Sequence, residues 1–485
     1  MVLVQPKTGP YDILTWGKLP LGLLCVAAIP YQKGYDVIII DQRFDNSWRG
    51  NLTKILKEEP ICVGITTMTG SQIKYALEAA RVVKEQSNVP VVFGGIHPSL
   101  LPAQTLENPY VDVVIVGEGE YAFIELLQAL RERRNLATVK GIWYKKGGAI
   151  YSTPRRELIR NLDELPELPL VLVDVEQYVS RAILNGRRSI DLQTSRGCPA
   201  KCAFCFNQVF NRGYWRGMSS KEAVRRVSET VRKYAIDDVF FTDDNCAASI
   251  PRLKEICQMF VSENLNITWR LDGIRADSIL RMEDETLQLL YASGCNDMYI
   301  GAESGSQEIL DRIDKNLRVE TIIEANRKLA KYPFIVKWTF ICGFPTESEE
   351  QREMSVKLAV QLCKENLNAY TPFLVFTPYP GTKLYDEAIE HGFNPPERLE
   401  DWANFSFDNF PLSSCAWYPR SEARKLNSLS FTSAFLNQNA TRKIDSKLAR
   451  FLFRLYAPIA CWRFKGNHHA FPIESLVGRK LLNLL

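Results

Sequence analysis

The chain has 485 residues, a length that predicts two or three domains with ample hydrophobic core. Its composition is that of an ordinary globular protein, with 46% apolar and 24% charged residues. The net charge of +4 gives no reason to expect nucleic acid as a partner of the whole chain. Charge is uneven, however, because residues 441–485 hold nine Lys or Arg against two Asp or Glu. The basic tail is therefore a separate feature.

The first residues, MVLVQPKTGPYDIL, show no signal-peptide pattern, and the apolar run Leu19–Pro30 is too short to span a bilayer. We therefore expect a cytoplasmic protein. Its twelve cysteines would then lie in a reducing compartment, in which close spacing indicates metal binding or catalysis rather than disulfides. The cysteines outside residues 198–205 are scattered, and we expect most of them to be buried as small apolar residues.

Short apolar runs alternate with amphipathic helical patterns over residues 1–135. This alternation predicts an α/β domain with a doubly wound, Rossmann-like parallel sheet, whose ligand would bind beyond the carboxyl ends of the strands. Three turns at those ends are rich in small residues, TTMTG (66–70), GGIHPS (94–99) and GEGE (117–120). A helical pattern covers Ser71–Gln86. The predicted strands are Val2–Gln5, Val37–Asp41, Cys62–Thr67, Val91–Gly94 and Val111–Val116.

Residues 136–188 read as a linker. The segment GIWYKKGGAIY predicts a hairpin with its turn at Gly147-Gly148, and the Pro-rich LDELPELPL favours irregular structure.

Strand and helix patterns resume over residues 189–391 with a longer period, which predicts a partial (β/α)6 barrel with its active face at the strand carboxyl ends. Ser219 and Glu222 have capping-box spacing at the start of one helix. The predicted strands are Ser189–Thr194, Asp238–Thr242, Ile267–Leu271, Met298–Ala302, Ile335–Ile341 and Tyr370–Phe376.

Three cysteines follow the first barrel strand in SRGCPAKCAFCF (195–206), with C-x3-C-x2-C spacing. A structural zinc site usually takes four ligands, and the nearest further cysteine is Cys246, with no histidine nearby. Three cysteines on a four-iron cluster would leave one iron open to a substrate or cofactor. The spacing of Cys198, Cys202 and Cys205 therefore favours a [4Fe-4S] cluster over zinc.

The chain resembles the radical S-adenosylmethionine (radical SAM) superfamily, whose signature is this cysteine spacing after the first barrel strand. FFTDDN (240–245), YIGAESGS (299–306), CGFPTES (342–348) and TPYPGTKLY (377–385) match later motifs of the family in order. In that family the open iron holds SAM, whose cleavage gives a 5′-deoxyadenosyl radical. The resemblance implies SAM contacts by Phe204, Asp243, Asp244, Glu303, Ser304 and Gly343.

Each of these pieces also has an ordinary structural interpretation. The aspartates before Asn245 could cap a helix, Glu303 could be a surface carboxylate, and PYPGT could be a simple turn. Arg270 and Asp272 also fall at a strand end, and nothing assigns them to a ligand.

Within the superfamily the first domain resembles the cobalamin-binding subgroup across nearly its full length. A D-x-H-x-x-G motif is missing, because Gly95 stands two residues before His97. We therefore expect His97 to line the corrin pocket or to form a local hydrogen bond rather than to bind cobalt. A nucleotide site or a domain without a ligand would also fit the pattern. The implied cobalamin contacts are Thr66, Thr67, Gly94, Gly95, His97, Gly117, Glu118 and Gly119.

These resemblances imply a cobalamin-dependent radical SAM enzyme that carries a [4Fe-4S] cluster, SAM and cobalamin. We expect a methyltransferase, in which methylcobalamin delivers a methyl group to an unactivated carbon. An oxidative cyclase or carbon–carbon rearrangement enzyme is the alternative, and a non-catalytic iron–sulfur sensor is an alternative of another class. No side chain is nominated as a catalytic acid or base, because the cofactors carry the chemistry.

Residues 392–485 predict an α-helical extension with aromatic-rich stretches, DWANFSFDNF (401–410) and a basic, apolar stretch from Leu448. Such a helix packs on the barrel, lies on an anionic membrane or holds an apolar substrate. Of these, we expect the tail helix to pack on the barrel with its basic face in water, and peripheral membrane contact through the tail and an apolar substrate are the alternatives. The expected partners are a small-molecule substrate and a flavodoxin- or ferredoxin-type reductant, and no nucleic acid.

Overall fold

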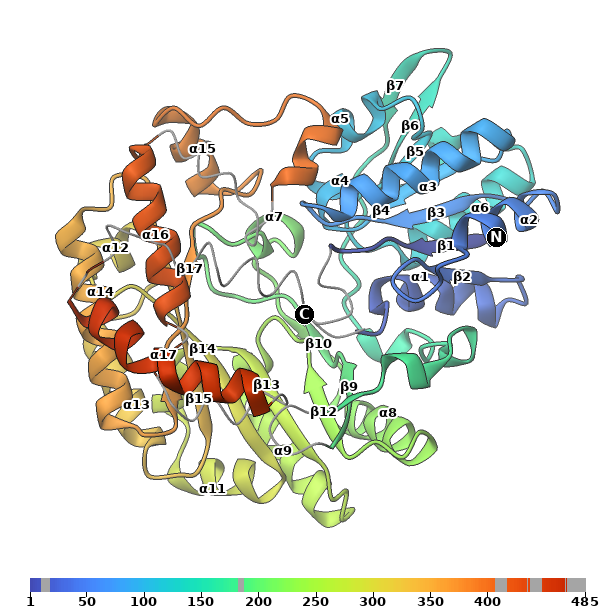
Figure 1. Ribbon diagram of the computed structural model, residues 1–485. Helices are drawn as coiled ribbons and strands as arrows, with labels where there is room; N and C mark the ends of the chain where they lie inside the picture. The colour runs from blue at the N-terminus through green and yellow to red at the C-terminus, as the bar shows by residue number, and fades with distance from the viewer. Residues whose placement is uncertain are drawn as a thin grey trace. The chain divides into compact units, whose positions relative to one another are not determined.

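The computed structural model describes residues 1–9, 18–181, 187–405, 417–433, 435–436, 447–466 and 468, and the statements below concern these residues. They fall into two compact units, each of which is assembled from separate stretches of the chain (Figure 1). The first unit comprises Met1–Ser180, Val209–Asn211 and Pro395–Pro411, and the second comprises Arg181–Gln208, Arg212–Asn394 and Leu412–Leu485.

The first unit is built on a seven-stranded sheet with the order β2-β1-β3-β4-β5-β6-β7. The five predicted strands are all present, and they pair in parallel as a doubly wound sheet does. Their bounds are β1 Val2–Gln5, β2 Ile38–Asp41, β3 Val63–Thr66, β4 Val91–Gly94 and β5 Val113–Ile115.

Helices connect these strands. The apolar run from Leu19 forms a helix of this unit, and the predicted helix over 71–86 is α3. The helices are α1 Leu21–Gln32, α2 Trp48–Leu56, α3 Gln72–Gln86, α4 Ile96–Leu100, α5 Pro102–Glu107 and α6 Glu120–Arg131.

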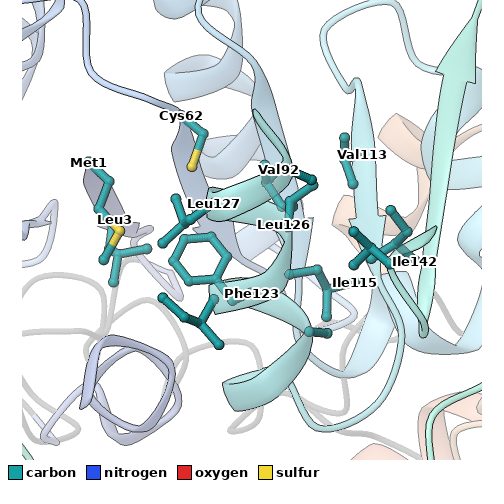
Figure 2. Close-up of a cluster of buried hydrophobic side chains, with 14 of the residues drawn as sticks. Met1, Leu3, Cys62, Val92, Val113, Ile115, Phe123, Leu126, Leu127 and Ile142 are labelled. Atoms are coloured by element: carbon teal, nitrogen blue, oxygen red, sulfur yellow. The ribbon is translucent and has the colours of Figure 1, made fainter. Parts of the chain in front are cut away.

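One hydrophobic core of this unit is formed by the sheet, α1 and α6. In Figure 2 the side chains of Phe123, Leu126 and Leu127 from α6 lie among Leu3 and Val92 of the sheet. Apolar residues recur three or four positions apart in α6, so they share one face of the helix. Each fully buried side chain of this size contributes about 1.5–3 kcal/mol to folding.

The hairpin predicted at Gly147-Gly148 is present as β6 Ile142–Lys146 and β7 Ala149–Ser152. Both glycines have positive φ, +58° and +81°, as a tight hairpin turn requires. Strand β6 pairs antiparallel with β5, so this part of the linker adds two strands to the first sheet. The Pro-rich stretch forms only short 3₁₀ turns, such as Leu162–Glu164.

The second unit holds the predicted partial (β/α)6 barrel. Six successive strand positions pair in parallel, in the order β9-β12-β13-β14-β15 with β16 and β17 both on β15. Pro372 divides the sixth strand in two, because proline has no backbone N–H for the ladder. The strands are β8 Ser180–Arg181, β9 Arg188–Leu192, β12 Asp238–Phe241, β13 Thr268–Ile274, β14 Cys295–Glu303, β15 Ile335–Cys342, β16 Ala369–Tyr370 and β17 Phe373–Val375.

A small antiparallel pair, β10 Ser195–Arg196 and β11 Arg216–Gly217, flanks the cysteine segment. The helices that follow the strands are α7 Asn207–Phe210, α8 Ser220–Lys233, α9 Ile250–Ser262, α10 Ala276–Arg281, α11 Asp284–Ala292, α12 Gln307–Arg312, α13 Val319–Leu329, α14 Glu349–Glu365 and α15 Lys383–Glu390.

The predicted cap at Ser219 is present, since its side chain accepts a hydrogen bond from the backbone N of Glu222. The reciprocal half of a capping box is missing, because the Glu222 carboxylate binds Arg225 and Arg226. A complete box instead begins α14, at Ser348 and Gln351.

The predicted C-terminal extension divides between the units. The 3₁₀ helix Leu399–Asn404 belongs to the first unit, whereas α16 Arg420–Ser433 and α17 Lys447–Lys465 belong to the second. Residues 406–410 of DWANFSFDNF and most of the tail after Lys465 lie outside the described residues. Across the described ranges, no helix combines the length and apolarity that crossing a membrane requires.

Candidate cofactor sites

The cysteine loop begins shortly after β9 and is fastened by backbone hydrogen bonds at its centre. Ala203 donates its N–H to the carbonyl of Ile313 at 2.8 Å and accepts from the N of Leu384 at 3.1 Å. The N of Cys205 donates to the carbonyl of Cys202 at 3.1 Å, which closes a turn. Cys202 is buried, and Cys198 and Cys205 are half-buried.

The three thiols lie within electrostatic reach of one another. Burial raises the pKa of Cys205 to about 12, with Cys202 and Cys198 acting in the same direction and a backbone hydrogen bond with Asn207 opposing the shift. Burial also raises the pKa of Cys202, with Cys198 acting in the same direction. Charged thiolates therefore oppose one another in this loop unless cations compensate them.

This donor set suits a four-iron cluster, in which each cysteine binds a different iron and the fourth iron stays open. Among the described residues, no three His, Cys, Asp or Glu side chains converge as the ligands of a single ion would.

Asp243 holds the chain that enters the loop. Its carboxylate is 3% exposed and accepts hydrogen bonds from the N and Oγ1 of Thr194, at 2.7 and 2.8 Å, and from Oγ of Ser195 at 2.5 Å. Burial raises the pKa of Asp243, and these hydrogen bonds oppose the shift.

Asp244 ties the two ends of the loop together. Its Oδ2 accepts from the N of Gly197 at 2.7 Å, and its Oδ1 accepts from Nδ2 of Asn207 at 2.9 Å. Gly197 directly precedes the first cysteine, and Asn207 follows the third. Both predicted aspartates thus reach the cysteine loop, and both bond to the protein itself.

Asn245 directly follows the two aspartates in the chain, and its Nδ2 lies 3.4 Å from Sγ of Cys198. Sequence reasoning missed its role, because the two neighbouring acids carried the stronger signal. Gly273 of β13 lets the backbone of Asp244 and Asn245 approach closely, because glycine has no side chain. At φ +72°, a Cβ on Gly273 would stand 2.1 Å from the carbonyl oxygen of Asp244.

Glu303 ends β14 with φ +63° and forms a buried ion pair, its Oε1 lying 2.7 Å from Nζ of Lys315. Burial alone would lower the pKa of Lys315, but the charge of Glu303 raises it. Lys315 in turn lowers the pKa of Cys202, so the pair lies near the cysteine loop. Nothing in the sequence singled out Lys315.

Ser304 and Gly343 are engaged locally. The hydroxyl of Ser304 shares a hydrogen bond with Ser355 at 3.1 Å. Gly343, at φ +86°, donates its N–H to Oε2 of Glu347 at 2.6 Å. Glu347 was not predicted. Burial raises its pKa to about 7.

Phe204 is half-buried, and its ring centre lies 6.4 Å from that of Phe344, which directly follows Gly343. The structure therefore places Phe204 close to the segment that contains Gly343.

In the first unit the ends of β3, β4 and β5 meet, and one serine joins their turns. Oγ of Ser99 donates to the carbonyl of Gly95 at 2.6 Å and accepts from the N of Gly117 at 2.9 Å. The N of Thr67 donates to the carbonyl of Gly94 at 2.8 Å. The predicted residues Thr66, Thr67, Gly94, Gly95 and Gly117 therefore form one connected edge.

The glycines of this edge differ in the space around them. A Cβ on Gly95, at φ +99°, would stand 2.8 Å from the carbonyl oxygen of Thr67, whereas one on Gly94 or Gly117 would meet nothing within 4 Å. The latter two leave room for a ligand. Gly119 is the N-cap residue of α6, where a Cβ would stand 2.9 Å from Cγ2 of Val26. Oε2 of Glu118 accepts from the N of Ile159 at 2.7 Å.

His97 is fully buried, with its Nδ1 3.0 Å from Oγ1 of Thr69 and its ring 5.4 Å from that of Trp402. It thus forms the local hydrogen bond that was one of the two predicted roles. Burial lowers its pKa to about 3, so the ring is neutral. Nε2 of His97 and Oγ1 of Thr67 are buried without a partner among the described residues. Such orphaned atoms, beside the open glycines, fit a site that takes a polar ligand.

Comparison with known proteins finds two known domains in the chain. The model of the radical SAM superfamily matches residues 192–359, and that of the B12 binding domain matches residues 19–127. The chain is 33% identical to the uncharacterized methyltransferase PH0819 of Pyrococcus horikoshii, over 76% of this chain and 78% of that protein. It is 27% identical to the anaerobic magnesium-protoporphyrin IX monomethyl ester cyclase of Rubrivivax gelatinosus, over 74% of this chain and 66% of that one.

Among solved structures, the chain shares its fold with the radical SAM methyltransferase TsrM from Kitasatospora setae, with a TM-score of 0.70, 16% identity and 99% of each chain covered. A C-x3-C-x2-C loop at the strand ends of a partial barrel, a doubly wound unit before it, and a relative at this level of identity lead to one assignment. The chain belongs to the family of radical SAM enzymes that carry a cobalamin-binding domain.

Proposed function

We propose that this enzyme is a methyltransferase that transfers a methyl group to an unactivated carbon of a small molecule. Its cofactors are a [4Fe-4S] cluster, SAM and cobalamin. The observation that carries the proposal is the three-thiol loop at the barrel's strand ends, in a chain that also holds a cobalamin-binding unit. When bound, these groups supply the one-electron chemistry and the methyl carrier.

The protein's own residues bind and orient these groups. We assign Cys198, Cys202 and Cys205 to the cluster, within a barrel of residues 189–391. Phe204, Glu303, Ser304 and Gly343 are proposed to surround SAM. Asp243 and Asp244 then act on SAM through the cysteine loop that they hold, since their oxygens bond to it.

We assign cobalamin to residues 1–135, at the edge where the turns after β3, β4 and β5 meet. The proposed contacts are the open glycines Gly94 and Gly117 and the orphaned polar atoms of Thr67 and His97. Thr66, Gly95 and Gly119 shape this edge. Glu118 acts indirectly, because its carboxylate holds Ile159.

Anaerobic purification with added iron and cobalamin, followed by a turnover assay with SAM and a reductant, tests the proposal. We expect a bound corrin and the formation of both 5′-deoxyadenosine and S-adenosylhomocysteine. A protein that binds a cluster and leaves SAM uncleaved would be a sensor and would overturn the proposal.

Oxidative cyclisation is the second candidate, favoured by the identity to a magnesium-protoporphyrin cyclase. The two reactions differ in the substrate's mass, which gains one methylene in methylation and none in rearrangement. Formation of 5′-deoxyadenosine without S-adenosylhomocysteine would favour the cyclase.

We extend the proposal to a flavodoxin- or ferredoxin-type reductant and to a cytoplasmic location. None of the eleven cysteines that the structure describes forms a disulfide, which suits a reducing compartment. Stimulation of SAM cleavage by reduced flavodoxin, compared with dithionite, tests the choice of reductant.

We also propose that α17 contacts an anionic membrane surface and that the substrate is apolar. Phe451, Leu455, Ile459 and Trp462 are 53–65% exposed, and their spacing places them along one side of the helix. The other side packs inward, where the ring of Phe464 lies 5.3 Å from that of Phe373. The α17 sequence contains five Lys or Arg and no acidic residue, a charge that complements anionic lipid.

Sedimentation with vesicles tests this contact. We expect binding to vesicles of phosphatidylcholine with phosphatidylglycerol, lost in a Leu455→Glu/Trp462→Glu variant. Leu367→Glu, at a residue 79% exposed elsewhere on the unit, should bind like the wild type. Failure of the wild type to sediment, or self-association through α17, would contradict the membrane contact.

A further inference from the structure

We propose that Trp417 and Tyr418, in the C-terminal extension, are positioning residues that hold the loop of residues 343–347 in the conformation that binds SAM. Both lie beyond residues 192–359, the segment that the superfamily model matches, so they are specific to the extension of this chain. The inference rests on the proposed function, in which Gly343 is one of the residues around SAM, and it adds two residues that act on SAM through the loop.

Both side chains form hydrogen bonds to backbone carbonyls of the 343–347 loop. Nε1 of Trp417 donates to the carbonyl of Gly343 at 3.1 Å. The hydroxyl of Tyr418 lies 2.9 Å from the carbonyl oxygen of Phe344 and 3.0 Å from that of Glu347, so its one proton is shared between them. Two consecutive residues of the extension therefore hold both ends of the loop.

The backbone of the loop is strained and needs such support. Thr346 has φ +61°, in the left-handed region that β-branched residues rarely adopt. Such a conformation persists only where the surrounding structure fixes it, and it is typical of segments that hold ligands. Within the loop, the N of Gly343 donates to Oε2 of Glu347 at 2.6 Å, and the N of Glu347 donates to the carbonyl of Phe344 at 3.1 Å. The extension adds the support from outside.

Helix α16, which begins just after Tyr418, packs on the same loop. A Cβ on Gly343 would stand 3.0 Å from Cδ1 of Leu426, so the helix approaches the backbone of the loop closely. Glu422 of α16 forms an ion pair with Arg352 of α14, and Nη1 of Arg352 donates to the carbonyl of Glu347 at 3.1 Å. The start of α16, the loop and α14 are therefore bonded to one another.

Aromatic rings connect the extension to the proposed SAM site. The ring centre of Trp417 lies 6.2 Å from that of Phe376, which lies 5.2 Å from that of Phe344. Phe344 in turn lies 6.4 Å from Phe204 of the cysteine loop. A shift of the 343–347 loop would move Gly343 and Phe344 together, so we expect SAM to lose contacts when the hydrogen bonds from the extension are removed.

Conservative substitutions separate these hydrogen bonds from the packing of the rings. Trp417→Phe and Tyr418→Phe each keep an aromatic ring and remove the donor, and a double variant removes both donors. Trp269→Phe is the matched control, because Nε1 of Trp269 also donates to a backbone carbonyl, that of Ser293 at 2.9 Å, at the amino end of β13. Each cluster-loaded full chain is examined for iron content, for SAM affinity by equilibrium dialysis, and for KM and kcat of SAM cleavage.

We expect SAM affinity to fall about threefold in each single variant and about tenfold in the double variant, as the loss of ordinary hydrogen bonds predicts. The KM for SAM should rise in parallel. Iron content and kcat should stay close to the wild-type values, because the three cysteines are unchanged. Trp269→Phe should lower the thermal stability and leave SAM affinity unchanged, which separates positioning from a general loss of stability.

Other outcomes would overturn the inference. Wild-type SAM affinity in the cluster-loaded double variant would show that the loop does not depend on the extension. An equal loss of affinity in Trp269→Phe would trace the effect to general stability, and loss of the cluster from both single variants would show that the extension supports the whole barrel. A wild-type protein that binds no SAM would instead refute the proposed function, so the two failures are distinguishable.

Discussion

Two aspartates of the barrel site and two polar side chains of the first sheet's edge are engaged in opposite ways. In the barrel, each carboxylate oxygen of Asp243 and Asp244 accepts a hydrogen bond from the cysteine loop or from a residue next to it. At the edge of the first sheet, Nε2 of His97 and Oγ1 of Thr67 have no partner among the described residues. The two aspartates of the barrel therefore hold a loop, whereas these two polar atoms of the first sheet's edge stay available to a ligand.

This difference follows from how each cofactor is attached. A cluster is attached by covalent bonds to cysteines, so the surrounding protein mainly has to fix the positions of three thiols. A corrin that no side chain ligates would be retained by shape and hydrogen bonds, to which open glycines and polar atoms without a partner are suited. The five predictions below test this contrast, from the largest expected effect to the smallest.

Replacing a cysteine should have the largest effect. Cys202→Ala removes the most buried of the three ligands, and we expect loss of the [4Fe-4S] EPR signal and of SAM cleavage. Cobalamin binding should persist, because the corrin site belongs to the other unit. Simultaneous loss of corrin absorbance would contradict the independence of the two sites.

Asp244→Ala should loosen the loop without removing a ligand. Each hydrogen bond to a charged acceptor contributes about 1.5–3 kcal/mol, so losing two should lower the free energy of unfolding by about 3 kcal/mol or more. Iron content should fall in parallel. Asp244→Asn keeps one acceptor oxygen and should lie between the two proteins in urea denaturation. A variant as stable as the wild type would show that the two hydrogen bonds to Asp244 do not stabilise the loop.

Two adjacent glycines of the first unit should respond differently. Gly95→Ala places a Cβ 2.8 Å from the carbonyl oxygen of Thr67 at φ +99°, and strain of this kind costs about 1–3 kcal/mol. A Cβ on Gly94 meets nothing within 4 Å, so Gly94→Ala should stay stable and bind cobalamin more weakly. Thermal unfolding and corrin titration separate the two effects, and equal stability of both variants would refute the distinction.

The first unit should lose stability in mild acid because of His97. Its pKa is about 3 in the folded state against 6.5 when unfolded, so protonation favours the unfolded chain as the pH falls below 6.5. The loss approaches about 1.4 kcal/mol per pH unit. In His97→Gln this slope should be absent from hydrogen exchange of α3 and β4, and a slope that survives the substitution would exclude His97 as its source.

Glu347 should give the second unit the opposite response. Its pKa is about 7 when folded against 4.5 when unfolded, so ionisation favours unfolding as the pH rises from 4.5 to 7. Glu347→Gln should remove this trend and gain stability relative to the wild type over the same range. The expected slope is again about 1.4 kcal/mol per pH unit at most, and hydrogen exchange of β15 measures it.

The sequence predicted the helices, the strands and the kind of site better than it predicted which side chains bond to one another. Parallel strands are buried on both faces, so their apolar runs stand out, and all eleven predicted strand positions are occupied. The three cysteines likewise lie close together in the sequence, so their spacing could be recognised without the structure. What could not be read was the partner of each side chain, because partners such as Lys315 for Glu303 come from other elements.

Two further residues show the same limit. Trp402 packs on His97 from about 300 positions away, and no local pattern marks that contact. The role of Asn245 was hidden for a different reason. The strength of the two adjacent acids as predicted ligands drew attention away from an amide that reaches the sulfur.

The docking of Trp402 has a consequence for biosynthesis. Its Nε1 donates to Gln104 at 2.7 Å, and Gln104 donates to the carbonyl of Pro396, so a late segment completes the unit that is translated first. At roughly 5–20 residues per second, the ribosome needs about 15–60 s to make the intervening 298 residues. During that time the nascent chain must protect an unfinished surface around His97. Expressing the N-terminal half by itself would make that unfinished state permanent.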